Sequence, residues 1–196
     1  MINSLELRDD LHTFLREHDH ISTYNHCTAV GSCAGKLALN HKVSSEKAKI
    51  SGYLHDISAI YPNEYRIKVA KKMGIELNQE ELLFPMIIHQ KISKKMAEKV
   101  FKITDTDILS AIECHTTLKG DFSQLDLVLF VADKIRWDQN GTPPYLDGLM
   151  LKLENSLESA ALYYIEYILD HDIKIVHPWL KEAHHTLSRK VRGRIV

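Results

Sequence analysis

The sequence predicts an all-α fold, and three observations support this class. Only 8 glycines and 5 prolines occur among the 196 residues, about half the average share of these turn formers, whereas all-β sandwiches and barrels need many tight turns. Hydrophobic residues make up 44% of the chain, which excludes disordered and low-complexity classes. Apolar residues recur at helical spacing from end to end, and no segment shows the alternation that predicts a strand.

Each predicted helix follows a stripe of apolar residues spaced three or four positions apart. Leu7, Leu11 and Leu15 recur in this way and predict an amphipathic opening helix. The stripe between Leu146 and Ile168 is the longest of the chain. In chain order we expect helices over residues 7–15, 30–40, 45–55, 63–73, 105–115, 123–132, 146–168 and 178–191.

Residues with capping chemistry stand at the starts of several stripes. Serine and aspartate accept hydrogen bonds from the free N–H groups of a first turn, and proline suits the first helical position. Ser123 with Asp126 forms a start resembling a capping box. The other expected starts are Ser44 or Ser45, Thr104 or Asp105, and Pro178.

Glycine and proline mark the expected breaks. Gly74 suits the position just after a helix that ends near Met73. Pro85 interrupts the next apolar stretch, so residues 80–90 should form a broken helix or a loop. The clearest loop is 138–144, and its end, 141–144, is the only candidate boundary. We therefore expect one domain over residues 1–196, with a core at about 20–140 and a helical extension at about 144–192.

Charge and cysteine usage narrow the class of protein. Lys and Arg total 25 against 26 Asp and Glu, so there is no basic excess to indicate nucleic-acid binding. Three cysteines without CxxC spacing indicate reduced thiols. The N-terminus does not read as a signal peptide, and no apolar run reaches the length of a membrane span. We expect a cytoplasmic protein that does not contact a membrane.

Four histidines and two aspartates lie on or beside the apolar stripes. One buried histidine is usually a core residue with a single hydrogen bond, but six inward polar groups from different helices are costly to bury unsatisfied. A shared metal centre removes that cost, since neutral imidazoles and ionised carboxylates are good ligands. Six groups exceed the four of a structural zinc site and suit two ions, and the absence of thiolate favours iron or manganese. The six are His26, His55, Asp56, His89, His115 and Asp133.

The order of these six residues, H…HD…H…H…D, resembles the HD-domain metal-dependent phosphohydrolases. The flanking strings narrow the resemblance to the YqeK-like symmetrical bis(5′-nucleosyl)-tetraphosphatases, over roughly residues 20–140. This resemblance implies an all-α helical bundle with a di-metal centre in the helix core, with iron as the expected metal and Mn, Zn, Co or Mg also compatible. The strings are Leu54-His55-Asp56-Ile57, Ala111-Ile112-Glu113-Cys114-His115-Thr116-Thr117 and Phe130-Val131-Ala132-Asp133-Lys134-Ile135.

The resemblance also implies a role for each of the six residues. His26, His55, Asp56 and Asp133 would bind one ion. Asp56, His89 and His115 would bind the second, so Asp56 would bridge the two. Asp56 and His89 are the expected catalytic residues. The implied reaction is symmetrical hydrolysis of diadenosine tetraphosphate to two ADP by a hydroxide between the metals.

The sequence departs from the YqeK-like pattern at three positions. Ala59 replaces a lysine, Leu118 a glycine and Gln139 an arginine. Other side chains near the ligands are therefore candidates for substrate binding. They are Thr116, Lys134, Arg136 and Trp137, for which the alternatives are a helix-end cap, solvated surface cations and a core tryptophan.

These departures leave two alternative functions open. The first is an HD-domain hydrolase of another nucleotide phosphoester, and the second is a non-catalytic, metal-dependent nucleotide-binding module. The expected partner is a nucleotide polyphosphate, and a homodimer is left open. The other eight histidines, His177 included, should lie at the surface or cap helices, and the lysines from Lys91 to Lys102 should form a solvated helix face.

Overall fold

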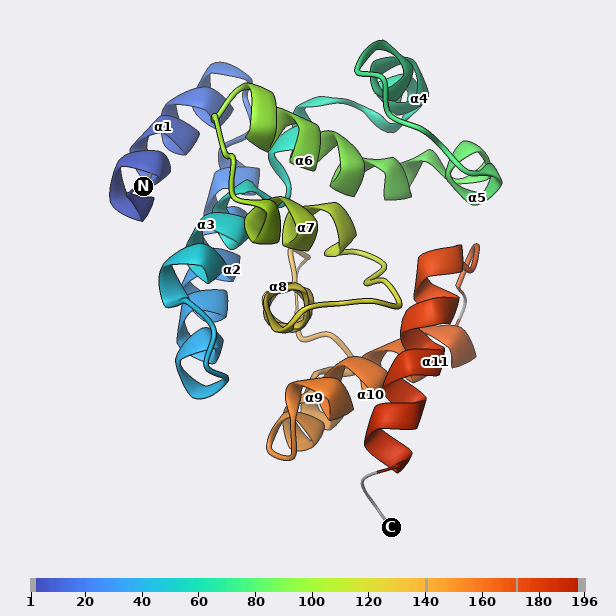
Figure 1. Ribbon diagram of the computed structural model, residues 1–196. Helices are drawn as coiled ribbons and strands as arrows, with labels where there is room; N and C mark the ends of the chain where they lie inside the picture. The colour runs from blue at the N-terminus through green and yellow to red at the C-terminus, as the bar shows by residue number, and fades with distance from the viewer. Residues whose placement is uncertain (1–2, 140, 172, 194–196) are drawn as a thin grey trace.

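The computed structural model describes residues 3–139, 141–171 and 173–193, and these residues form helices joined by loops, with no strand among them (Figure 1). The predicted all-α class is confirmed. No helix of this part of the chain is long and apolar enough to cross a bilayer. The elements are α1 (Ser4–Glu17), α2 (Ile21–Asn40), α3 (Ser45–Leu54), η1 (Ile57–Ile60), α4 (Asn63–Lys72), α5 (Gln79–Leu83), η2 (Pro85–Ile88), α6 (His89–Lys99), α7 (Thr106–Cys114), α8 (Gln124–Ile135), α9 (Leu146–Leu153), α10 (Leu157–Asp170) and α11 (Pro178–Arg192).

The helix starts follow the capping chemistry of the sequence. Of the two alternatives for α3, Ser44 is the cap, because its hydroxyl accepts from the Lys47 N–H. Asp105 caps α7, and Ser123 with Asp126 forms both hydrogen bonds of a capping box on α8. Pro178 occupies the first position of α11. The sequence therefore fixes these helix starts through local hydrogen bonds.

The long apolar stripe from Leu146 to Ile168 does not form one helix. It divides into α9 and α10, because Ser156 has an extended backbone and its hydroxyl accepts from the Ser159 N–H, 3.0 Å away. The apolar spacing continues across the break, so the stripe alone hides it. The break predicted at Pro85 is present between α5 and η2. In the predicted loop at 138–144, Asn140 lies outside the described residues.

Helix α8 is the central element of the fold (Figure 1). It packs against α2, α3, α7 and α10, and its residues from Leu125 to Ala132 are buried. Helices α2 and α3 cross closely, since a Cβ on Gly52 would lie 2.5 Å from the Gly31 Cα. Only glycine permits this approach. The close crossing brings the end of α3, where His55 lies, next to His26 on α2.

A buried polar cluster joins the C-terminal helix to the α5 region. Glu81 on α5 is fully buried, with its carboxylate 2.9 Å from Lys91 Nζ and 3.4 Å from His177 Nε2. His177 also contacts the Asn78 side chain and caps α11. His177 has the capping role that was one of the two predicted for it, although it is buried. Lys91 does not belong to a solvated helix face as the sequence suggested, because it is sequestered beside Glu81. Burial acts to raise the pKa of Glu81, but His177 and Lys91 outweigh it and lower that pKa.

Replacing Glu81 should destabilise the fold. Glu81→Gln removes the charge that compensates Lys91, and breaking such a buried pair costs about 3 kcal/mol of unfolding free energy. Because the folded-state pKa of Glu81 is lowered, its contribution should be complete above its ordinary value of 4.5 and be lost as the pH falls through the lower folded value. Urea unfolding at pH 7 and at decreasing pH measures both effects.

The matched control is Glu98→Gln, which removes an equal charge from a partly exposed pair with Lys95 and Lys99. This variant should unfold like the wild type. Equal stability of the Glu81 and Glu98 variants at pH 7 would contradict the assignment of Glu81 as a buried anchor.

Candidate metal centre

Three of the four histidines occupy helix boundaries and share one local hydrogen bond. His55 follows α3, His89 begins α6 and His115 follows α7. In each case the ring Nδ1 donates to the backbone carbonyl three residues earlier, at 2.8, 2.6 and 2.9 Å respectively. This bond fixes the ring orientation and places the proton on Nδ1. Each Nε2 of the neutral ring therefore presents a lone pair to the interior of the fold.

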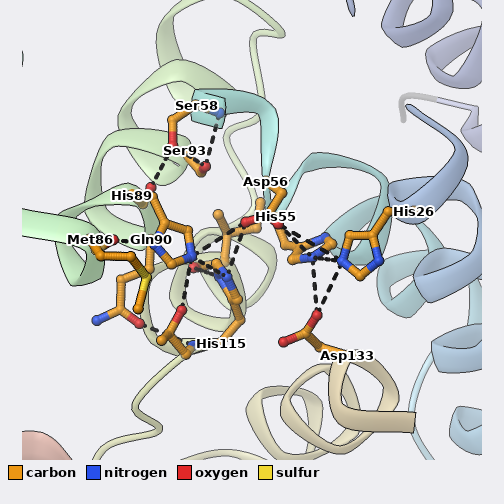
Figure 2. A network of polar contacts seen from close by, with 12 residues as sticks. His26, His55, Asp56, Ser58, Met86, His89, Gln90, Ser93, His115 and Asp133 are labelled. Carbon is orange, nitrogen blue, oxygen red and sulfur yellow. Dashed lines mark hydrogen bonds and ion pairs between the residues drawn. The ribbon is translucent and has the colours of Figure 1, made fainter. Parts of the chain in front are cut away.

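These lone pairs meet in the helix core (Figure 2). The Nε2 atoms of His89 and His115 lie 3.0 Å apart, and those of His26 and His55 lie 3.1 Å apart. Since His89 and His115 both donate through Nδ1, two lone pairs face each other between them. That arrangement is repulsive by itself and becomes favourable when a cation lies among the nitrogens. The chemistry of these donors therefore fits a metal site.

The two aspartates divide the cluster into two groups. Asp56 directs Oδ1 towards His89 and His115, at 3.3 and 3.4 Å, and Oδ2 towards His55 and His26, at 3.6 and 3.8 Å. Asp133 Oδ1 lies 3.3 Å from His26 and 3.4 Å from His55. The Asp56 carboxylate thus faces both histidine pairs, whereas the Asp133 carboxylate faces only the pair formed by His26 and His55. This geometry can hold two ions with Asp56 between them.

The pKa shifts in the cluster favour the ligating forms of both aspartates, His89 and His115. Burial acts to raise the pKa of both carboxyls, but the histidines around Asp56, and Lys134 with the histidines around Asp133, hold both well below their usual value. Burial lowers the pKa of His89 to about 4 and also lowers that of His115, so both rings are neutral at pH 7. Burial opposes protonation of His55 too, yet Asp56 outweighs it and raises that pKa. The carboxylates thus attract positive charge to the centre.

Five of the six cluster residues, all except the fully buried His55, form the floor of a pocket of about 530 Å³, a volume in the range of small-molecule sites. Polar residues from α2 and α4 and aromatic residues that follow α8 line its walls. Beyond the floor these residues include Ser22, Thr23, Asn63, Arg66, Met86, Thr116, Lys134, Trp137, Asp138, Tyr145 and Tyr164. Of the four substrate-binding candidates, Thr116, Lys134 and Trp137 therefore face the pocket.

Arg136, the fourth candidate, is absent from that lining and is exposed. Arg136 lies three residues after Asp133, a spacing that puts both residues on one face of a helix that continues past them. However, α8 ends at Ile135, and Arg136 has the non-helical angles φ −103° and ψ 61°. Helical spacing therefore no longer applies, and the guanidinium lies beside Cys33.

Lys134 is buried rather than solvated. Its ammonium lies 2.5 Å from Asp133 Oδ2 and 3.4 Å from the His115 carbonyl, above the rings of Phe130 and Tyr164. Burial acts to lower the pKa of Lys134, but Asp133 outweighs it and the pKa is raised. The lysine therefore stays charged and holds the second oxygen of Asp133.

The turn after His115 explains one departure from the family pattern. Leu118, which stands where a glycine is usual, has a left-handed backbone with φ +55° and is fully buried. Glycine adopts this conformation without strain, whereas leucine compensates through apolar burial. The Gln90 side chain accepts from the Thr116 N–H at 3.1 Å, and the Thr116 hydroxyl lies 3.0 Å from His89 Nε2. The turn thus directs Thr116 into the pocket.

Several lining residues were not anticipated from the sequence. Arg66 and Asn63 come from α4, and Tyr145 and Tyr164 from the region of α9 and α10. Asn63 and Arg66 are three residues apart, a spacing that predicts a shared helix face. Nothing in the sequence indicated that this face turns towards the histidines.

Known proteins resemble both the sequence and the fold. A Lactococcus lactis subsp. cremoris protein, called an uncharacterized protein in the pepC 5′ region, is 50% identical over 153 residues, which is 78% of each chain. The symmetrical bis(5′-nucleosyl)-tetraphosphatase of Bacillus subtilis is 27% identical over 181 residues, 91% of this chain and 92% of the relative. A Clostridium acetobutylicum crystal structure, described as a predicted HD superfamily hydrolase involved in NAD metabolism, superposes with a TM-score of 0.85 at 28% identity, covering 93% of this chain and 97% of the other.

The HD domain family matches residues 23–138, which include all six residues of the cluster. The hydrolases among the relatives confirm the expectation of an HD-superfamily enzyme. Sequence, fold and cluster agree, and the chain belongs to the HD domain family.

Proposed function

We propose that this protein hydrolyses a dinucleoside polyphosphate symmetrically, with diadenosine tetraphosphate as substrate and two ADP as products. The observation that carries the proposal is the two-sided contact of Asp56 with both histidine pairs on the floor of an open pocket. The name of the Bacillus subtilis relative supports the choice of substrate.

His26, His55, Asp56 and Asp133 would hold one ion, and Asp56, His89 and His115 the other. The nitrogen and oxygen donor set favours iron or manganese over a thiolate-bound structural zinc. When bound, the metal pair supplies Lewis-acid charge that neutralises phosphate oxygens and lowers the pKa of the attacking water. The water adds to one central phosphorus, the central P–O–P bridge breaks at that phosphorus, and the bridging oxygen leaves with the electron pair on the second ADP.

The chain's own residues position this reaction. Asp56 fixes the spacing of the two histidine pairs, and the Met86 carbonyl fixes the ring of His89. The Thr116 hydroxyl lies 3.0 Å from His89 Nε2, and when a metal takes that lone pair the hydroxyl would donate to a phosphate oxygen instead. Lys134 keeps Asp133 oriented. The ring of Trp137 offers a stacking surface for one adenine.

The product pattern tests the proposed reaction. Metal-loaded protein incubated with diadenosine tetraphosphate should release ADP alone, because attack at a central phosphorus divides the substrate equally. Ion-exchange chromatography of the nucleotides measures this outcome. Equal amounts of ATP and AMP would contradict symmetrical cleavage, and faster turnover of a mononucleotide would favour a different phosphoester. Tight nucleotide binding without any product would favour a non-catalytic module.

Removing the shared carboxylate should abolish turnover. Asp56→Asn keeps the side-chain volume but removes the charge that faces both histidine pairs, so activity should fall more than about a thousandfold. Metal content, measured by elemental analysis, should fall in parallel. Asp10→Asn is the matched control, because Asp10 is exposed on α1. An Asp56 variant that retains both metal and turnover would refute the assigned bridge.

A further inference from the structure

Arg66 is a cation in the wall of the metal pocket. It lies on α4, three residues after Asn63, and both side chains line the cavity above the histidine cluster. Its side chain is partly buried. On the neighbouring η1, Ala59 contributes only a methyl group to the same pocket. Arg66 therefore provides the positive charge that Ala59 does not supply to this pocket.

Two backbone carbonyls orient the guanidinium. Nε donates to the Tyr61 carbonyl at 3.1 Å, and Nη1 donates to the Met86 carbonyl at 2.9 Å. The same Met86 carbonyl accepts from His89 Nδ1 at 2.6 Å. Arg66 is thus anchored on the His89 side of the centre. Arginine has five N–H donors, so these two bonds leave three donors for a ligand.

The charge of Arg66 has no ion-pair partner among the described residues. Lys134, the other cation lining this pocket, is already paired with Asp133. Burial lowers the pKa of Arg66, and the negative charge of Asp56 counteracts that effect, so the guanidinium remains protonated. Partial burial of a cation that has unpaired N–H donors costs free energy unless an anion binds to those donors. A planar guanidinium is well suited to two phosphate oxygens at once.

We propose that Arg66 is a substrate-binding residue that holds the phosphates adjacent to the one under attack, on the His89 side of the centre. The inference rests on the proposed function and deepens it, because it assigns a subsite to the leaving nucleoside diphosphate. The carbonyl anchors hold the guanidinium in place before substrate arrives. Lys134 and the ring of Tyr164, which also line the pocket, lie on the Asp133 side of the centre.

Binding of ADP tests the subsite independently of turnover. In metal-loaded protein, Arg66→Gln should weaken ADP binding about ten- to a hundredfold, the effect of losing charged hydrogen bonds. Arg66→Lys should recover part of that loss. Lys68→Gln is the matched control, since Lys68 is an exposed cation on the same helix, and it should bind ADP like the wild type. Isothermal titration calorimetry measures all four proteins.

Kinetics and metal analysis separate the subsite from a role in positioning His89. Arg66→Gln should lower kcat/KM for diadenosine tetraphosphate by a similar factor. It should change hydrolysis of bis(p-nitrophenyl) phosphate, which has no adjacent phosphate, less than about threefold. Metal content and Tm should match the wild type. Loss of metal, or an equal loss on both substrates, would overturn the proposal and make Arg66 a support for the Met86 carbonyl.

The remaining outcomes are also decisive. Wild-type affinity for ADP in Arg66→Gln, or absence of ADP binding by the wild-type protein at millimolar nucleotide, would overturn the subsite. If the wild type fails to cleave diadenosine tetraphosphate but Arg66→Gln still weakens ADP binding, the proposed function fails while the phosphate subsite stands.

Discussion

The hydrogen bond from a histidine Nδ1 to the carbonyl three residues earlier determines the geometry of the whole centre. It occurs at His55, His89 and His115, each of which lies at a helix boundary. Because the bond uses the only proton of a neutral ring, Nε2 of His89 and of His115 faces inward as an acceptor. The surrounding fold therefore has to enclose several lone pairs and two carboxylates, which only positive charge can make favourable.

Helix packing satisfies that requirement by bringing short segments together from distant parts of the sequence. Helix α8 supplies Asp133 from the middle of the core, and the close crossing of α2 and α3 at Gly31 and Gly52 supplies His26 and His55. The Glu81 cluster ties α5 to α11, and η2, which carries the Met86 carbonyl, directly follows α5. The anchor at Glu81 and the orientation of His89 thus belong to one continuous stretch of backbone.

The sequence predicted those features of the structure that depend on local hydrogen bonds and on helical spacing. Capping serines and aspartates located helix starts, and polar residues on apolar stripes identified the six side chains that meet in the core. It did not reveal the break at Ser156, because apolar spacing runs through it, nor the place of Arg136, because its helix ends one residue earlier. Arg66 was also missed. Its approach to the centre depends on how α4 packs against η2, a tertiary contact that helical periodicity does not encode.

The pocket is electrostatically asymmetric, and this asymmetry bears on how it would select a polyanion. On one side Lys134 is neutralised by Asp133 and enclosed by aromatic rings, so that wall offers stacking surface more than charge. On the other side Arg66 keeps three donors beyond its two carbonyl bonds. A ligand that satisfies both walls needs an extended phosphate chain at one end and a flat ring at the other. A nucleotide with several phosphates has that form, whereas a free phosphate has no ring to contact the aromatic wall.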